Sequence, residues 1–139
     1  MNPSSPDRIE PEKILPERIL PERILVVDDE PNMLGLFKKV LGKEGYEVVT
    51  AFSGEEAVIK LEAEWFDLLI ADLKMPGMDG LALIREAKRF KADLPVLIIT
   101  GFSTESSAIE AVNLGVAGYL TKPFRVPQVL AAAAKALGE

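Results

Sequence analysis

Short apolar blocks alternate along the chain with segments in which apolar residues recur every three or four positions. The blocks predict five strands, at Arg23 to Asp28, Glu47 to Ala51, Asp67 to Asp72, Pro95 to Thr100 and Ala117 to Thr121. The third and fourth blocks contain continuous apolar runs, which are typical of strands that are buried on both faces of a sheet.

Helical spacing predicts an amphipathic helix after each strand. These helices are expected at Pro31 to Glu44, from Ser53 to about Leu61, and at Leu81 to Phe90, Thr104 to Leu114 and Pro127 to Leu137. Ser53 is the expected N-cap of the second helix, with Glu56 completing a capping box, and Gly45 and Gly115 are expected to end helices. The alternation predicts an α/β fold with a doubly wound parallel sheet and right-handed crossovers.

The first 25 residues contain a five-residue repeat. Pro11-Glu-Lys-Ile-Leu15, Pro16-Glu-Arg-Ile-Leu20 and Pro21-Glu-Arg-Ile-Leu25 follow one another directly. Proline at every fifth position prevents a continuous helix and removes donors from a central strand. We therefore expect a leader over residues 1–20 and a folded domain over residues 21–139. The leader is either a flexible tether or a segment whose Ile-Leu pairs dock on this domain or on a partner.

The amino-acid composition argues against several classes of function. The chain has 139 residues, a net charge of -6 and neither cysteine nor histidine. Its acidity argues against binding nucleic acid, and the missing side chains exclude disulfides, thiolate metal sites and catalysis by imidazole. No apolar run approaches the roughly 18 residues that a bilayer requires, and the acidic N-terminus does not resemble a secretory signal. A cytoplasmic location without membrane contact is expected.

Polar residues follow the predicted strands, where parallel sheets bind their ligands. Asp28 and Asp29 follow the first strand, Asp72 the third, Thr100 the fourth and Lys122 the fifth. Crowded carboxylates favour a divalent cation such as Mg²⁺, although Asp28 and Asp29 could instead cap the next helix. Asp72 could act as a nucleophile that forms an acyl phosphate, with Lys122 and Thr100 stabilising the charge on the phosphoryl oxygens.

These residues resemble the receiver domain of bacterial two-component response regulators. The resemblance covers the chain from about Arg23 and rests on the segments Ile24 to Glu30, Asp72 to Gly80, Ile98 to Gly101 and Gly118 to Phe124. It implies a flavodoxin-like fold with strand order 2-1-3-4-5. The stretch from Ala108 to Phe124 is most similar to receivers of nitrogen-regulation-type transcriptional activators. The sequence ends soon after the last predicted helix, so it fits a stand-alone receiver or a piece of a longer regulator without its output domain.

The resemblance also implies roles for single residues. Asp72 would be the phosphoacceptor, with Lys122 paired to the phosphoryl oxygens. Mg²⁺ or Mn²⁺ would be bound by Asp29, by Asp72 and by the backbone carbonyl of Lys74, with Asp28 acting through water. The side chain of Lys74 occupies a position that tunes phosphoryl lifetime in this family.

The family resemblance further implies how the domain would signal. Thr100 and Tyr119 would form the switch pair, and the Lys122–Pro123 bond would be cis. A sensor histidine kinase would dock near Leu34 and Phe37, and a homodimer would form through the face that carries Tyr119. The domain would be no enzyme, apart from its own self-phosphorylation and self-dephosphorylation.

Three other functions compete with this interpretation. A flavin-binding electron carrier shares the fold, but Asp28 and Asp29 would repel its phosphate. An aspartate-nucleophile phosphatase would have two aspartates separated by one residue after the first strand, whereas these two are adjacent. The third is a degenerate receiver that binds partners independently of phosphate, which the complete set of site residues disfavours.

Overall fold

The computed structural model describes residues 20–139. The leader predicted for residues 1–20 therefore lies outside the described residues, apart from Leu20. The five strands are β1 (Arg23–Val27), β2 (Glu47–Ala51), β3 (Leu68–Ala71), β4 (Val96–Thr100) and β5 (Gly118–Thr121). The helices of this part of the chain are α2 (Pro31–Lys43), α3 (Gly54–Ala63), α4 (Gly80–Phe90), α5 (Glu105–Asn113) and α6 (Val126–Ala136). None of these helices is long and apolar enough to cross a membrane.

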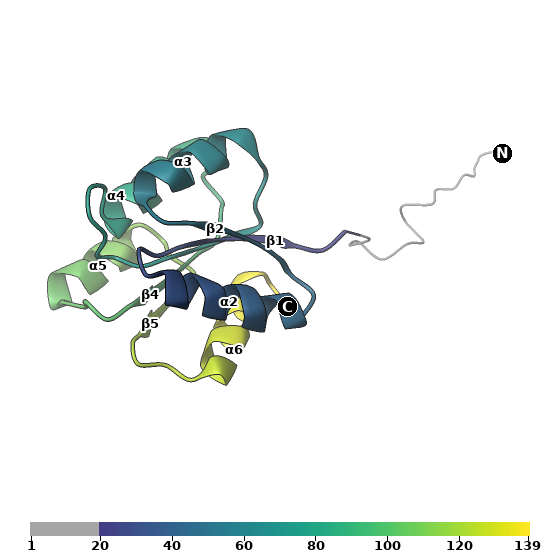
Figure 1. Cartoon of the computed structure of the whole chain (residues 1–139). Coiled ribbons are helices and arrows are strands. Elements are labelled where there is room, and N and C mark those ends of the chain that lie inside the picture. The colour runs from purple at the N-terminus through teal and green to yellow at the C-terminus, as the bar shows by residue number, and fades with distance from the viewer. Residues whose placement is uncertain (1–19) are drawn as a thin grey trace.

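The strands form one parallel sheet in the order β2-β1-β3-β4-β5, which confirms the predicted fold. Helices α2 and α6 cover one face of the sheet, and α3, α4 and α5 cover the other (Figure 1). Strand order reverses between β1 and β3, so the carboxyl ends of these two strands flank the crevice in which such sheets bind ligands.

Two apolar clusters, one on each face, hold the helices on the sheet. Leu25 and Leu69 point into the cluster with α3 and α4, while Ile24 and Ile70 point into the cluster with α2 and α6. All four side chains are at most 1% exposed. This burial on both faces explains why the central strands are continuous apolar runs rather than alternating ones.

All five helices begin within one residue of the predicted starts, although not every cap is the expected one. The Ser53 hydroxyl accepts a hydrogen bond from the Glu56 N–H at 3.1 Å, as predicted. The Glu56 carboxylate, however, accepts from the N–H of Phe52 at 2.6 Å, one residue before the N-cap, so the capping box is not the expected one. The Asp79 carboxylate accepts from Ala82 N–H, so α4 begins at Gly80 rather than Leu81.

Tyr46 should make stability depend on alkaline pH. Burial, a 2.9 Å hydrogen bond to the Glu139 carboxylate and the charges of Glu139, Glu22 and Glu44 raise the pKa of Tyr46 to about 12. An unfolded tyrosine ionises near pH 10, so this contribution to stability is complete below about pH 10 and lost as the pH rises towards 12. Urea unfolding on either side of pH 10 should show a smaller loss of stability for Tyr46→Phe than for the wild type. An equal loss in both proteins would contradict the assignment.

Candidate functional site

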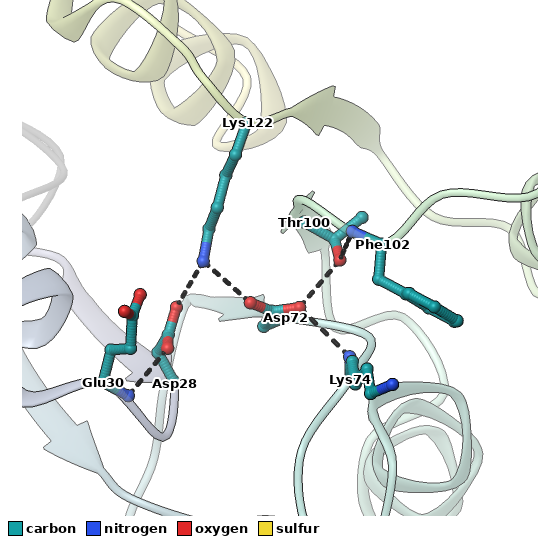
Figure 2. A network of polar contacts seen from close by, with 7 residues as sticks. All are labelled: Asp28, Glu30, Asp72, Lys74, Thr100, Phe102 and Lys122. Carbon is teal, nitrogen blue, oxygen red and sulfur yellow. Dashed lines mark hydrogen bonds and ion pairs between the residues drawn. The ribbon is translucent and has the colours of Figure 1, made fainter.

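Four of the predicted site residues meet at the carboxyl edge of the sheet. Asp28 follows β1, Asp72 follows β3, Thr100 ends β4 and Lys122 follows β5. Figure 2 shows these side chains converging on Asp72, whose carboxylate lies at the centre of the network. Residues up to 94 positions apart in the sequence are thus in direct contact.

Asp72 is buried, and its two carboxylate oxygens have different partners. Oδ1 accepts hydrogen bonds from the Thr100 hydroxyl at 2.7 Å and from the Lys74 backbone N–H at 3.1 Å. Oδ2 accepts from the Lys122 ammonium at 2.8 Å. The Thr100 hydroxyl is fully buried and accepts in turn from the Phe102 N–H at 3.0 Å, which fixes its orientation. The carboxylate is therefore held in one orientation by donors from three segments.

Lys122 bridges two carboxylates. Its ammonium donates to Asp72 at 2.8 Å and to Asp28 at 3.0 Å. Burial alone would lower the pKa of Lys122, but its hydrogen bonds to Asp72 and Asp28 and their negative charges outweigh burial, and the pKa is raised. Burial raises the pKa of Asp28, against the lowering effect of hydrogen bonds from the Glu30 N–H and Lys122. The site thus places one cation between two buried acids.

The two adjacent aspartates after β1 lie in different environments. Asp28 is 2% exposed and belongs to the network, whereas Asp29 is exposed and has no hydrogen bond or ion pair with any other described residue. The structure therefore does not draw Asp29 into contact with Asp72, and its predicted role as a direct metal ligand stays a prediction. The alternative that these two residues cap α2 is not seen, because this helix has no side-chain cap at its N-terminus.

The oxygen-rich carboxyl edge of the sheet fits a divalent metal. Within residues 20–139, no three acidic side chains cluster closely enough to hold a metal ion by themselves. Mg²⁺, however, typically takes only one or two carboxylates and completes its shell with carbonyls and water. Asp28 and Asp72 are a pair of buried carboxylates that share a single cation. This donor set fits a hard cation such as Mg²⁺ or Mn²⁺.

Lys74 and Phe102 form a contact that the sequence did not reveal. The Lys74 ammonium lies 4.4 Å from the centroid of the Phe102 ring, a cation–π geometry. Both residues also donate a backbone N–H to the site, Lys74 to Asp72 and Phe102 to Thr100. The two side chains therefore meet next to the network, each two residues after one of its polar residues.

Tyr119, the predicted switch residue, does not touch Asp72. It is half-buried, packs against the cluster on the α3, α4 and α5 face, and its hydroxyl lies 2.7 Å from the Ser103 hydroxyl. Ser103 comes three residues after Thr100, so the loop after β4 connects the two residues of the predicted pair. The predicted cis bond between Lys122 and Pro123 is present.

The amino-acid sequence is similar to one family model and to several curated proteins. A model of the response regulator receiver domain family matches residues 24–134. Transcriptional regulatory protein ZraR of Salmonella typhimurium is 37% identical over 113 residues, which cover 81% of this chain and 26% of that protein. Transcriptional regulatory protein GlrR of Escherichia coli is 43% identical over 99 residues, covering 71% of this chain and 22% of that protein. The chain thus spans about a quarter of the length of these relatives.

Solved structures agree with the sequence relatives. A receiver domain protein from Methanospirillum hungatei superposes with a TM-score of 0.83 at 31% identity, covering 86% of this chain and 95% of that one. The response regulator TrrA of Thermotoga maritima, solved in complex with Mg(2+)-BeF, has a TM-score of 0.75 at 37% identity and covers 83% of this chain and 98% of that one.

Proposed function

Because the chain belongs to the response regulator receiver domain family and thus to two-component signalling, we propose that Asp72 accepts a phosphoryl group from a partner histidine kinase. The observation that carries this proposal is the pattern of contacts around Asp72. A single buried carboxylate receives an ammonium, a hydroxyl and a backbone N–H, from Lys122, Thr100 and Lys74. Such donors are what a phosphoryl group needs at its peripheral oxygens.

In the transfer, an oxygen of the Asp72 carboxylate forms a bond to phosphorus while the bond between phosphorus and the donor nitrogen of a phosphohistidine breaks. The electron pair of the broken bond leaves with that nitrogen, and the product is an acyl phosphate. The reaction requires positioning and positive charge more than acid or base catalysis. Lys122 supplies part of this charge, and the hydrogen bonds to Oδ1 fix the orientation of the carboxylate.

A divalent metal completes the proposed site. Asp72, Asp29 and the Lys74 carbonyl would hold it directly, with Asp28 acting through water. When bound, Mg²⁺ or Mn²⁺ would neutralise charge on the phosphoryl oxygens. Support comes from the fit of the buried carboxylate pair to a hard cation and from the relative TrrA, which was solved with Mg(2+)-BeF.

Phosphorylation would be read out through Thr100 and Tyr119. A phosphoryl group adds negative charge at Asp72 and so favours the state in which Thr100 and Lys122 point at it. Movement of Thr100 would shift the following loop, and the Ser103 contact to the Tyr119 hydroxyl would break as the ring turns inward. The surface formed by α5, β5 and α6 would then change its partners, a second copy of the chain among them.

The proposal also covers where the domain would act and which activities it would lack. The domain would act in the cytoplasm as a phosphoacceptor and not as an enzyme with a separate substrate, apart from its own phosphorylation and dephosphorylation. It would not contact nucleic acid itself, because its net charge is -6. Any DNA-binding output would belong to another domain or to a partner.

Incubation with acetyl phosphate, with and without Mg²⁺, tests the proposal. Intact mass spectrometry should detect one added phosphoryl group with Mg²⁺ and almost none after the metal is chelated. The second candidate, a receiver that works without phosphate, predicts no adduct under either condition. The intact set of Asp28, Asp72, Thr100 and Lys122 in one network favours the first outcome.

Lys122→Ala should separate phosphorylation from its readout. The variant would leave the buried acceptors of Asp28 and Asp72 without their shared donor, which should reduce stability by on the order of 2 kcal/mol. It should still acquire the phosphoryl group, but with a weaker conformational response in the NMR spectrum around Tyr119. Lys39→Ala, on the exposed surface of α2, should change stability by less than about 0.5 kcal/mol. A full response in Lys122→Ala would contradict the proposed coupling.

A further inference from the structure

A cavity of about 670 Å³ lies at the amino edge of the sheet, opposite the edge that carries Asp72. Its walls come from the segment that enters β1, the turn between α2 and β2, and the outer side of α6. In Figure 1, α2 and α6 both end near the place where the chain enters β1. Its volume is within the range of about 300–1,000 Å³ that small-ligand pockets occupy. Nothing in the phosphorylation chemistry uses this cavity.

The lining of the cavity is acidic with an apolar side. Glu22, Glu44 and Glu139 line it together with Tyr46, and the charges of all three carboxylates contribute to the raised pKa of that tyrosine. Leu130 and Ala134 of α6 and the 74% exposed Leu20 add apolar surface. Such a lining fits a peptide segment that carries one cation close to aliphatic side chains.

The third repeat, Pro21 to Leu25, shows how this pentapeptide is bound when it packs on the domain. Its Ile-Leu pair is fully buried in β1. Its Arg23 pairs with Glu64 at 2.7 Å and Glu47 at 3.4 Å, and the guanidinium lies 4.8 Å from the Phe66 ring centroid. The cation of the repeat is thus recognised by carboxylates and an aromatic ring. The cavity offers the same combination in its glutamates and Tyr46.

We propose that this cavity binds residues 16–19 of the second repeat of the same chain, with the Arg18 guanidinium among the glutamates and the Ile19 side chain against α6. The repeat is attached to the cavity through Leu20, which already lines it, so its effective concentration is in the millimolar range or above. This inference is independent of the phosphorylation chemistry.

Engineered disulfides can test this placement, because the chain contains no cysteine. Glu17→Cys is combined with Lys43→Cys, which is exposed beside the cavity, or with Glu62→Cys, which is exposed near the end of α3 on the opposite face. Both α2 and α3 end at the amino edge of the sheet, so a freely moving leader would reach both positions similarly. In the full chain with oxidised glutathione, the 17–43 disulfide should form within one chain at least about tenfold faster than the 17–62 disulfide.

Charge reversal tests how the repeat is recognised. Arg18→Glu should slow the 17–43 disulfide to the 17–62 rate, Arg18→Lys should preserve the fast rate, and Glu44→Lys should partly restore it in the Arg18→Glu background. Equal rates for the two pairs would overturn the proposal. Disulfide-linked dimers as the main 17–43 product would replace it with binding between two copies, and a fast rate that is indifferent to Arg18→Glu would remove the recognition of the cation.

Discussion

Replacement of Asp72 by asparagine is expected to abolish the Mg²⁺-dependent incorporation of a phosphoryl group. An amide oxygen is a much poorer nucleophile than a carboxylate and cannot form a stable acyl phosphate. The fold should persist, because asparagine can still accept the hydrogen bonds of the Thr100 hydroxyl and the Lys74 N–H, and Lys122 retains its ion pair with Asp28. Intact mass after incubation with acetyl phosphate and Mg²⁺ measures the loss directly.

Asp79→Asn is the matched control for this variant. Asp79 lies seven positions further along the same loop, and its carboxylate caps α4 through the Ala82 N–H at 2.8 Å. Asparagine is as good an N-cap as aspartate, so this change should affect neither stability nor phosphorylation. If Asp72→Asn were phosphorylated as fully as Asp79→Asn, Asp72 would not be the acceptor.

Gly80→Ala is expected to cause the largest loss of stability among the simple substitutions near the site. A Cβ at position 80 would lie 2.2 Å from the Asp72 carbonyl oxygen and 2.7 Å from the Leu73 Cα. Both atoms belong to the backbone, so no rotation of a side chain can relieve the clash. We expect a loss of about 3 kcal/mol, at the upper end of the usual cost of overpacking. The same displacement would move the backbone that carries Asp72 and should slow phosphorylation.

Gly35→Ala provides the comparison, because it introduces the same methyl group into a helix. Nothing lies within 4 Å of a Cβ at position 35, an exposed position in the interior of α2. The higher helix propensity of alanine should stabilise this variant by about 0.5–1 kcal/mol. Urea unfolding of both variants measures the contrast. A Gly80→Ala protein as stable as the wild type would show that the loop after Asp72 can shift freely.

The fold could be predicted from the sequence because strands and helices differ in the spacing of their apolar residues. Continuous apolar runs indicated strands buried on both faces, and the spacing around Leu34, Phe37 and Leu41 indicated a helix with one buried side. The strand order followed from the family resemblance, since hydrophobic pattern alone does not say which strands are neighbours. Helix starts differed by a residue where Asp79, within a loop rich in proline and glycine, served as the cap.

Within the site, the sequence identified the residues but not all of their environments. Asp28 and Asp29 are adjacent and both follow the end of β1, where the chain bends at Asp29. The structure shows that Asp28 is the one that pairs with Lys122. The amino-acid sequence does not reveal which of the two aspartates contacts a residue 94 positions away.

The sequence also did not predict two contacts between segments that are far apart along the chain. The Lys74 to Phe102 contact joins the loops after β3 and β4, and the Ser103 to Tyr119 contact joins the loop after β4 to β5. Neither pair has a local spacing signal. Position does carry some information, because Lys74 and Phe102 each come two residues after a residue of the network. Because β3 and β4 are neighbours in the sheet, these two positions lie close together after the strand ends.

The most direct test of the central claim is to locate the phosphoryl group by reduction with borohydride. Hydride converts an aspartyl phosphate to homoserine, which peptide mass spectrometry can assign to one position. After incubation with acetyl phosphate and Mg²⁺, we predict homoserine at position 72 alone, and none when Mg²⁺ is chelated. Homoserine at position 28 or 29, or no homoserine at all in a protein of wild-type stability, would contradict the assignment of Asp72 as the phosphoacceptor.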